Sequence, residues 1–325
     1  MTDLNHLDEA IHRSPDGEAI ALLAAGTSLQ ELPDGISDLV SLRTVDLDRN
    51  GLTALPKAIS NLSRLTNLSL YANRLDEVPE SIGHLGSLQH LSLGKNRLTR
   101  VPDAIWRLSE LLSLNLAENQ ITEISDDVRN LGNLRMLDLG HNRLGDVPEG
   151  IADLPALTDY LYLSDNGLTS MPAALGRLDR LDYLNLTDNL LTMLPAEIGG
   201  MSALRELRLY NNRINWLPDE IGALSRLREL HLMNNQLAAL PESLGNLSEL
   251  RHLDLRNNPL RQLPESVGKL TRLTHLDLRA THLAGLPESI GSLPNLEKLD
   301  LRWLKMHRVP RWLDSLRERG CVVLL

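Results

Sequence analysis

The chain has 325 residues and a formal net charge of -10, with 42% hydrophobic and 23% charged residues. This composition is ordinary for a folded soluble protein, but aromatic residues make up only 3% and phenylalanine is absent, so the core must be aliphatic. A net acidic chain excludes general nucleic-acid binding, because phosphate contacts need clustered cations; the small basic excess from Leu204 onward would have to act locally.

The N-terminal 18 residues carry apolar side chains at helical spacing, at Leu4, Leu7 and Ile11, which predict a capping helix over residues 1–18. They contain no apolar run long enough for a signal peptide, and no stretch of about 18 uninterrupted apolar residues occurs in the sequence. We therefore expect no membrane segment and a cytoplasmic location. Export into a host cell without a recognisable signal is the alternative.

A 23-residue unit begins at Ala19 and continues to Glu318, with thirteen copies in one register. Its consensus is L-x-x-L-x-L-x-x-N-x-L-x-x-L-P-x-x-I-G-x-L-x-x. Ser125 takes the place of one of the recurring prolines, and one additional residue falls near Tyr160. Repetition at this period predicts a solenoid, in which each unit buries its apolar face only against its neighbours.

Within each unit, apolar residues alternate at period two in L-x-x-L-x-L, which predicts a short parallel strand. In the ninth unit, Leu207 and Leu209 should point into the core, while Arg208 and Tyr210 should point outward. A recurring Asn follows the strand, where its amide can satisfy backbone groups of adjacent units. The L-P-x-x-I-G-x-L segment predicts a short helical or 3₁₀ turn with the proline in its first turn.

These turns need more room than strands about 4.8 Å apart, so the stack should curve with the sheet on its inner side. The expected fold is an α/β solenoid shaped as a curved horseshoe, with a parallel concave sheet and short helical or 3₁₀ segments on the convex side. At its end, Leu313 and Leu316 predict a short helix that stops at Gly320, and residues 319–325 predict a cap strand.

The C-terminal cap is also expected to contain Trp303, Met306 and Trp312. Cys321 is the single cysteine and cannot form an intrachain disulfide, which favours a reducing compartment. Because no His lies at a recognisable catalytic spacing from it, we interpret Cys321 as a small buried residue.

The 23-residue unit with L-P-x-x-I-G-x-L resembles the Ras-group leucine-rich repeats of plant intracellular and animal Ras-regulating scaffold proteins. Bacterial cytoplasmic and effector repeat proteins use similar units. The resemblance covers residues 19–318 but lies in scaffold positions, which fix the fold and not the partner. It implies recognition of a macromolecule on the concave face, in some members a small GTPase, and it transfers no catalytic residue.

Chemistry-bearing motifs are absent from the sequence: it contains no phosphate loop, H-E-x-x-H, cysteine pair or nucleophile elbow. We therefore expect no enzymatic activity and no cofactor. His252 and His275 should become neighbours beside Asp254 and Asp277, and such a group can bind a metal. We interpret these side chains as solvated polar groups on the sheet and expect no metal.

Tyrosines in the seventh to ninth units mark the favoured binding surface. Tyr162, Tyr183 and Tyr210 fall at outward strand positions, and Tyr160 is ambiguous because of the inserted residue. Exposed tyrosines supply apolar contact and hydrogen bonding together, although tyrosine also simply suits strands. The adjoining outward residues included in this surface are Glu206, Arg208, His231 and Met233.

A D-L-R motif occurs in three successive units and extends this surface. Its pairs are Asp254 and Arg256, Asp277 and Arg279, and Asp300 and Arg302. Stacking should place an Asp column beside an Arg column, so that opposite charges neutralise each other. The motif predicts either an exposed, self-compensating polar surface or a docking site for a charged partner.

The favoured function is a monomeric, non-catalytic scaffold that binds a partner protein on its concave face, around the seventh to thirteenth units. It would act in signalling or as a host-directed effector. The alternative is an inhibitor or modulator of an enzyme such as a small GTPase, which would act by covering the surface of that enzyme. We expect no nucleic-acid partner and no membrane partner.

Overall fold

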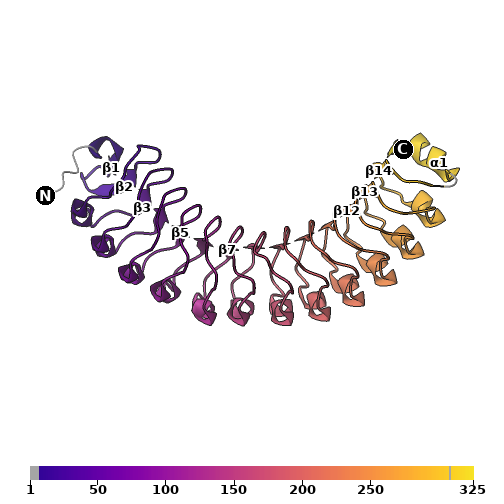
Figure 1. Ribbon diagram of the computed structural model, residues 1–325. Coiled ribbons are helices and arrows are strands. Elements are labelled where there is room, and N and C mark those ends of the chain that lie inside the picture. The colour runs from indigo at the N-terminus through magenta and orange to yellow at the C-terminus, as the bar shows by residue number, and fades with distance from the viewer. Residues whose placement is uncertain (1–6, 307–308) are drawn as a thin grey trace. The chain divides into compact units, whose positions relative to one another are not determined.

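The computed structural model describes residues 7–306 and 309–325. The chain divides into two compact units, Met1–Tyr162 and Leu163–Leu325, and each is described by itself. Both units repeat one motif, in which a three-residue strand leads through a turn to a five-residue 3₁₀ segment. Within each unit the strands line a concave side and the 3₁₀ segments line the opposite side (Figure 1).

Residues 7–162, the described part of the first unit, contain eight strands, in sequence order across the sheet. The strands are β1 (Ile11–Arg13), β2 (Ala19–Leu23), β3 (Thr44–Asp46), β4 (Asn67–Ser69), β5 (His90–Ser92), β6 (Ser113–Asn115), β7 (Met136–Asp138) and β8 (Tyr160–Tyr162). The 3₁₀ segments are η2 (Asp8–Ala10), η3 (Asp34–Asp38), η4 (Lys57–Asn61), η5 (Glu80–His84), η6 (Asp103–Arg107), η7 (Asp126–Asn130) and η8 (Glu149–Asp153).

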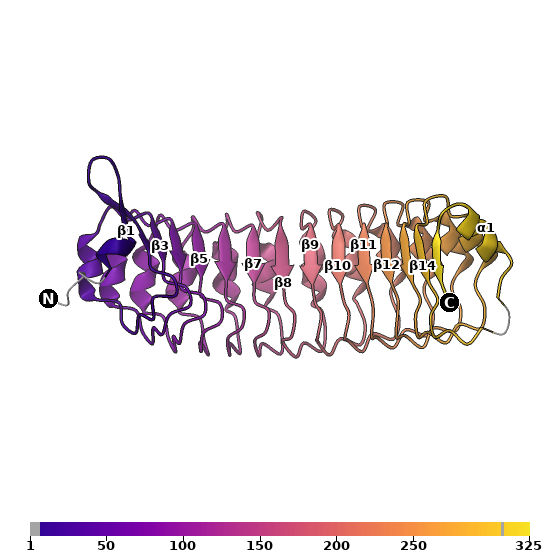
Figure 2. The same ribbon diagram turned by 90° about the horizontal axis from the view of Figure 1, so that it is seen from above.

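In the described residues of the second unit, 163–306 and 309–325, there are seven strands, the last of which follows an α-helix, and the strands lie side by side in Figure 2. The strands are β9 (Tyr183–Asn185), β10 (Glu206–Arg208), β11 (Glu229–His231), β12 (His252–Asp254), β13 (His275–Asp277), β14 (Lys298–Asp300) and β15 (Val322–Leu324). The helical segments are η9 (Ala173–Arg177), η10 (Ala196–Gly200), η11 (Asp219–Ala223), η12 (Glu242–Asn246), η13 (Glu265–Lys269), η14 (Glu288–Ser292) and α1 (Trp312–Glu318).

The predicted alternation of inward and outward residues is confirmed. Leu207 of β10 pairs with Leu184 of β9 and Leu230 of β11 in parallel register, and all three side chains are fully buried. The Ile and last Leu of the L-P-x-x-I-G-x-L segments are buried as well, as at Ile221 and Leu224, except that Leu39 of the first segment is only partly buried. The core is therefore a stack of aliphatic columns, and burial of these side chains supplies about 1.5–3 kcal/mol each before entropy is deducted.

The recurring Asn forms the predicted hydrogen-bonded ladder. Asn235 is typical: its Nδ2 donates to the carbonyl oxygens of Leu209 and Leu232, at 2.9 and 3.0 Å, and its Oδ1 accepts from the backbone N–H of Ile214, at 3.0 Å. One amide thus satisfies backbone groups of its own repeat and of the preceding one. Thr281 stands in the Asn position of a later repeat and keeps only the local bond, from Oγ1 to the Leu278 carbonyl at 2.8 Å.

The residue before each ladder Asn adopts a left-handed backbone conformation that the consensus does not reveal. It is non-glycine in every repeat from Arg49 to Trp303, with φ between 49° and 67°. Three successive repeats use Asn here, at Asn211, Asn234 and Asn257, and Asn tolerates this conformation better than most residues. Every repeat therefore turns sharply just after its strand.

The recurring proline precedes the 3₁₀ segment and does not lie inside its first turn as expected. Pro218, for example, is extended, with φ -68° and ψ 153°, and the segment starts at Asp219. Ser125 adopts the same conformation without proline, at φ -65° and ψ 145°, and its side chain accepts a hydrogen bond from the backbone N–H of Asp127. A capping hydroxyl at Ser125 thus performs the role that the fixed φ of proline has elsewhere.

The expectation of an N-terminal capping helix is wrong in residues 7–18. These residues form η2 and then β1, which pairs antiparallel with β2. Leu7 and Ile11 are buried as expected, because a strand can cover the open sheet edge while presenting only alternate residues to the core. Leu4 lies outside the described residues.

The C-terminal end consists of α1 followed by β15, which pairs in parallel with β14. Leu313 and Leu316 bury the inner face of α1, and Trp312 packs against Gly291 of η14. Trp303 is not part of this cap, contrary to expectation, because its side chain is 71% exposed at a left-handed position. No helix in the described ranges is both long and apolar enough to cross a membrane.

The inserted residue lies before β8. Met136 pairs with Tyr160, an offset of one more residue than that between Ser113 and Met136, so Tyr160 occupies a regular outward strand position. The additional residue is accommodated after η8, where Leu154 has ψ 105°, in contrast to 63° at Leu131. The ambiguity of Tyr160 is thereby resolved.

Close packing of successive 3₁₀ segments requires glycine at Gly176. A Cβ atom on Gly176 would overlap the backbone carbonyl oxygen of Glu197 in the next segment. We expect Gly176→Ala to lower the free energy of unfolding by about 2 kcal/mol, since backbone must move to admit the methyl group. Urea unfolding followed by circular dichroism measures this, with Gly285→Ala as control because a Cβ there meets no atom within 4 Å. Equal stability of the two variants would contradict the packing argument.

Candidate interaction surface

The outward side chains of β9 to β14, with the residue two positions after each strand, form what we call the strand face of the second unit. Every predicted binding residue from Tyr183 onward lies on this face. They are Tyr183, Glu206, Arg208, Tyr210, His231, Met233, Asp254, Arg256, Asp277, Arg279, Asp300 and Arg302. Parallel register places equivalent residues of neighbouring strands next to each other, so the face consists of columns.

At its first strands the face is held together by contacts between side chains. The Arg208 guanidinium lies 5.4 Å from the centre of the Tyr183 ring, within cation–π range, and its Nε donates to Oε1 of Glu206 at 2.5 Å. These three side chains come from β9 and β10 and are each half-buried or partly exposed. Tyr183 and Arg208 are therefore fixed in place before any partner arrives.

A column of three histidines continues the face across β11 to β13. The rings of His231 and His252 lie 5.2 Å apart, and those of His252 and His275 stack in parallel at 5.3 Å. Burial, followed by the charge of His231, lowers the pKa of His252, so this ring is neutral near pH 7. This column of imidazole rings gives a surface with both apolar and hydrogen-bonding character.

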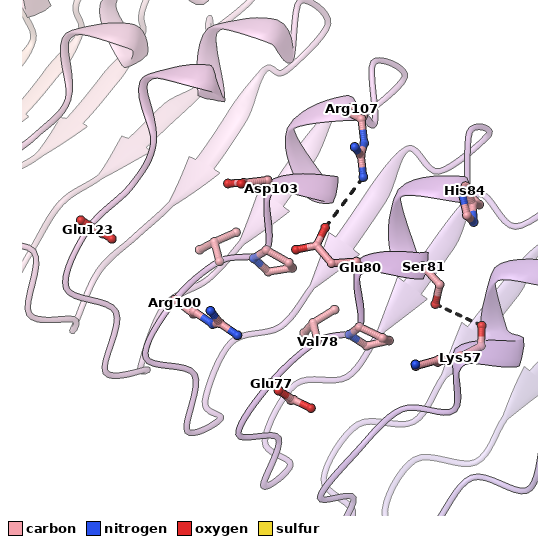
Figure 3. A pocket seen from close by; sticks show the side chains of 13 residues that line it. Lys57, Glu77, Val78, Glu80, Ser81, His84, Arg100, Asp103, Arg107 and Glu123 are labelled. Carbon is pink, nitrogen blue, oxygen red and sulfur yellow. Dashed lines mark hydrogen bonds and ion pairs between the residues drawn. The ribbon is translucent and has the colours of Figure 1, made fainter.

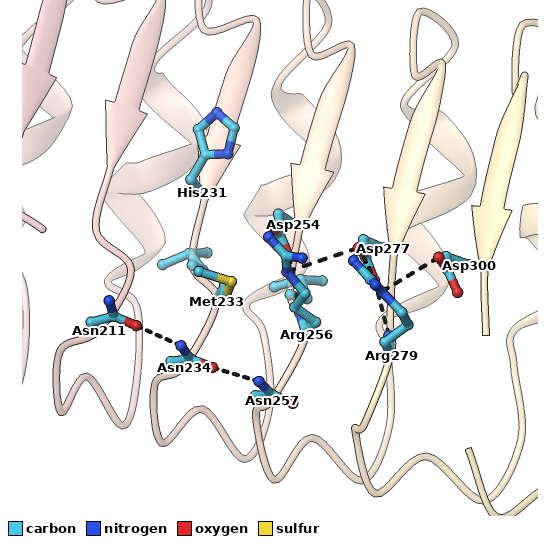
Figure 4. Close-up of polar contacts among 12 residues, drawn as sticks. Asn211, His231, Met233, Asn234, Asp254, Arg256, Asn257, Asp277, Arg279 and Asp300 are labelled. Atoms are coloured by element: carbon cyan, nitrogen blue, oxygen red, sulfur yellow. Dashed lines mark hydrogen bonds and ion pairs between the residues drawn. The ribbon is translucent and has the colours of Figure 1, made fainter. Parts of the chain in front are cut away.

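The three D-L-R pairs form a continuous Asp–Arg ladder, part of which appears in Figure 4. Arg279 contacts Asp277 of its own repeat at 2.5 Å and Asp300 of the next at 3.4 Å. Arg256 does the same with Asp254 at 2.9 Å and with Asp277 at 3.9 Å. Arg256 and Arg279 thus each bridge two repeats, whereas Arg302 pairs with Asp300 of its own repeat, in line with the predicted neutralisation.

The ladder differs from the predicted exposed surface because its carboxylates are covered. The side chains of Asp254 and Asp300 are only 7% and 1% exposed, and the arginines lie above them. Burial raises the pKa of Asp254, against the opposing charge of Arg256. Burial acts in the same direction on Asp300, but hydrogen bonds from Arg302 and the charge of Arg279 outweigh it and lower the pKa. A partner would therefore meet the guanidinium groups and not the aspartates.

Beside this ladder, an unpredicted row of amides follows the strands. Asn211 donates to Asp188 at 2.7 Å. Asn234 donates to Asn211 at 2.5 Å, and Asn257 donates to Asn234 at 2.6 Å (Figure 4). These are the left-handed residues described above; Asn257 is exposed, and Asn211 and Asn234 are partly exposed at the rim of the face. The N-N dipeptides at 211–212, 234–235 and 257–258 were the signal in the sequence.

The predicted tyrosine cluster is divided between the two units. Tyr160 and Tyr162 belong to β8 of the first unit, where their rings meet edge to face with centres 5.0 Å apart, whereas Tyr183 and Tyr210 belong to the second. Burial raises the pKa of Tyr160. The two pairs are therefore treated as features of separate surfaces.

A family model described as a leucine-rich repeat region matches residues 22–95, 118–237 and 238–321, and a second leucine-rich-repeat model matches residues 86–144. The chain belongs to the leucine-rich-repeat family. Its solved structural relatives include a leucine-rich-repeat protein of Leptospira interrogans, with 32% identity and a TM-score of 0.84 over 92% of this chain and 82% of that one. No curated protein matched the sequence.

Two further leucine-rich-repeat structures are similar. An internalin, InlF, of Listeria monocytogenes has 25% identity and a TM-score of 0.82 over 94% of this chain and 87% of that chain. The plant peptide hormone receptor RGFR1, solved in complex with RGF2, has 26% identity and a TM-score of 0.73. That match covers 97% of this chain but 59% of the receptor chain, so this protein spans little more than half of it.

The arrangement of His252 and His275 in the structure does not favour a metal site at these two histidines. His252 and His275 stack against each other, and Asp254 and Asp277 bind arginines. A different group of donors converges: among residues 7–306 and 309–325, Glu206, Glu229 and His231 offer ligand atoms that all lie within 4.8 Å of one another. Glu229 was missed because its outward position carries no sequence motif.

The concave side of the first leucine-rich-repeat unit contains a depression that the sequence did not reveal. It has a volume of about 380 Å³ and runs across β3 to β6 as far as Tyr160. Its floor carries small uncharged polar side chains such as Asn67, Ser69 and Ser92. Short side chains at consecutive outward positions leave the trough open and were the available signal.

A pocket of about 740 Å³ lies on the 3₁₀ side of the first unit, between η4, η5 and η6 (Figure 3). Arg107 and Glu80 form an ion pair there at 3.8 Å, and Ser81 donates to the Lys57 carbonyl at 3.1 Å. The ion pair is about two-thirds exposed, so it is screened by water and adds little energy. This pocket brings together solvated surface charges and no convergent acid, base or nucleophile.

Cys321 is buried, with 5% of its surface exposed, as the sequence predicted. Burial is also the main cause of the raised pKa of its thiol. A raised pKa lowers the thiolate fraction at neutral pH, and the thiolate is the reactive form. Cys321 is therefore a core residue of the C-terminal cap.

Proposed function

We propose that this protein binds a partner protein through the strand face of the second unit, without catalysing a reaction. The observation that carries this proposal is preorganisation: Tyr183, Arg208, Arg256 and Arg279 are each held by a neighbouring side chain. Ordering a long side chain on binding costs about 0.5–1.5 kcal/mol, and side chains already held in place avoid that cost.

The composition of this face also suits protein recognition. Tyrosine and arginine dominate binding energy at protein interfaces, and this face presents Tyr183 and Tyr210 beside Arg208 and the arginines of the Asp–Arg ladder. Repeat solenoids generally use their extended concave surfaces for binding. The receptor RGFR1, solved as a complex with RGF2, is a relative that holds a partner.

The proposal also covers the repeat type, the oligomeric state, the cellular location and the role of the protein. We propose a monomeric protein of the Ras-group type that works in the cytoplasm or, after export, in a host cell, as a signalling scaffold or effector. The L-P-x-x-I-G-x-L consensus and the single buried Cys321 support this setting. Fractionation of native cells with an antibody to the protein would test the location.

The binding surface can be tested with a partner recovered by affinity purification from native lysate. We expect replacement of Tyr183 and Tyr210 together by alanine to weaken the purified complex about 100-fold or more, since central aromatic residues contribute about 2 kcal/mol or more each. Isothermal titration calorimetry with the purified partner measures the change in Kd.

The matched control is Tyr71→Ala. Tyr71 is also an outward tyrosine, but it lies in the first unit, where its hydroxyl donates to Glu118 at 2.9 Å. It should leave the affinity unchanged. Full affinity in a folded double variant at Tyr183 and Tyr210 would disprove the assignment of the surface. Loss of a catalytic activity of the partner on binding would instead identify an enzyme modulator.

A further inference from the structure

We propose that Glu206, Glu229 and His231 form a binding site for a divalent transition metal of the zinc class. Glu206 lies on β10 and the other two on β11, and the parallel register pairs Glu206 with Glu229 and Arg208 with His231. Two adjacent rigid strands therefore present all three donors on one side of the sheet. These side chains lie on the strand face, so a bound metal would alter part of the proposed partner surface, but the observations that support the site do not depend on partner binding.

The distances are close to those that a metal requires. His231 Nε2 lies 3.1 Å from Oε2 of Glu229 and 3.8 Å from Oε1 of Glu206. Ligand atoms about 2.0–2.2 Å from a tetrahedral Zn²⁺ lie roughly 3.3–3.5 Å from one another. Small rotations of the two flexible glutamate side chains would bring the donors to these separations without backbone movement.

The carboxylates of Glu206 and Glu229 have less compensating positive charge than the aspartates of the neighbouring repeats, which favours binding of a cation. In the Asp–Arg ladder, an arginine two positions after each strand compensates each aspartate, whereas the corresponding positions after β10 and β11 hold Tyr210 and Met233. The carboxylates of Glu206 and Glu229 lie directly opposite each other, an arrangement of like charges that destabilises a sheet. Arg208 compensates only Glu206.

Glu229 is left with a weak partner. Within the described part of the chain, its recorded ion pair is with His231, which carries a charge only when protonated. A metal ion bound to neutral His231 would supply positive charge to both glutamates at once. Metal binding would weaken the bond between Arg208 and Glu206, because the metal ion and the guanidinium group compete for the same carboxylate oxygen.

The histidine is held in place for ligation. Its ring packs on that of His252, which is stacked in turn on His275, so few rotamers are open to it. Ligands that are restrained before binding pay less entropy when the metal arrives.

The donor set selects the class of metal. One imidazole nitrogen and two carboxylate oxygens suit zinc, whereas Mg²⁺ and Ca²⁺ favour six or more oxygen ligands. Three protein ligands leave a coordination position open toward solvent, on the exposed side of the face. Co²⁺ is the spectroscopic probe for such a site because its visible absorption reports the number and geometry of its ligands.

The experiment is titration of the full chain, freed of metal by a chelator, with ZnCl₂ in a calorimeter and with CoCl₂ in an absorption spectrometer. We expect one equivalent to bind with Kd in the micromolar range. His231→Ala and Glu229→Gln should each weaken binding at least about tenfold, since each removes one of three ligands. Arg208→Ala should tighten binding, because it releases Glu206 and removes a positive charge.

His275→Ala is the matched control, since His275 lies in the same stack but outside the ligand group. Because His275 supports His231 only indirectly, through His252, its replacement should weaken metal binding far less than His231→Ala does, and circular dichroism establishes that each variant is folded. The proposal is overturned by a lack of saturable binding at about 100 µM metal, by undiminished binding in His231→Ala, or by equal losses in His231→Ala and His275→Ala. None of these outcomes bears on partner binding.

Discussion

Replacing Asn258 by alanine is expected to lower the free energy of unfolding by about 4 kcal/mol. Its side chain is 1% exposed; Nδ2 donates to the carbonyls of Leu232 and Leu255, both at 2.9 Å, and Oδ1 accepts from Leu237 N–H at 3.0 Å. Alanine removes these bonds and leaves backbone groups of two repeats buried without partners. The effect is large mainly because these backbone groups stay buried without a hydrogen-bond partner, and less because the Asn side chain is lost.

The measurement is urea unfolding of the full chain, with Asn257→Gly as the adjacent control. Asn257 is exposed and left-handed, and glycine adopts that conformation freely, so the control should change stability by less than about 1 kcal/mol. Hydrogen exchange gives a local readout: the amide of Leu237 should exchange faster in Asn258→Ala, because its acceptor is gone. An unchanged rate at Leu237 would refute the ladder as the source of the effect.

The second large effect is expected at Asp300. Asp300→Asn should cost about 3 kcal/mol at neutral pH, the lower end for a broken buried ion pair, because Arg302 is partly exposed. The carboxylate accepts from Arg302 at 2.9 and 2.7 Å and faces Arg279 at 3.4 Å. An amide keeps the shape but carries no charge for these two guanidinium groups.

The pH dependence of this effect follows from the direction of the pKa shift. The folded-state pKa of Asp300 is lowered, so its ionised form stabilises the protein above the unfolded-state pKa, near 3.9. That contribution is lost as the pH falls through the lowered folded-state pKa. The stability difference between the unaltered protein and Asp300→Asn should therefore shrink below about pH 4 and be nearly absent once both states are protonated.

Asp254→Asn provides the matched comparison, since Asp254 occupies the same column but has a raised pKa. In that case the folded state binds the proton more tightly, so ionisation reduces stability as the pH rises past the unfolded-state pKa. Its replacement by Asn should cost much less than that of Asp300 at pH 7. If both replacements lower the free energy of unfolding equally in urea at pH 7, the ionised carboxylate of Asp300 does not stabilise the protein more than that of Asp254 does.

The repeating elements were predictable because their cause is local and recurs in every unit. Period-two leucines such as Leu207 and Leu209 can reach a core only from a strand, and Asn235 has polar atoms that only backbone groups can satisfy. Even the exception at Ser125 follows the same local rule, because a side-chain cap replaces a proline. The burial of Cys321 followed from its place beside the last apolar residues.

The predictions that failed concern places where a residue's neighbour belongs to another repeat or where the repeat pattern ends. Residues 7–18 follow helical spacing, yet β2 offers an open edge with unpaired backbone groups, and a strand satisfies them. Trp303 looked like a cap residue, but its left-handed backbone turns the side chain outward. The donors of Glu206 and Glu229 meet only because two strands pair in register.

The sequence alone determined that the protein is a leucine-rich-repeat solenoid, which residues face inward, and which columns of side chains face outward, since a fixed period of 23 residues turns linear spacing into spatial order. Only the tertiary structure decided the burial of Asp254 and Asp300 beneath arginines, the division of the tyrosines between two units, and the convergence of Glu206, Glu229 and His231. Burial, pKa and ligand distance depend on side chains from different repeats, and no single repeat encodes them.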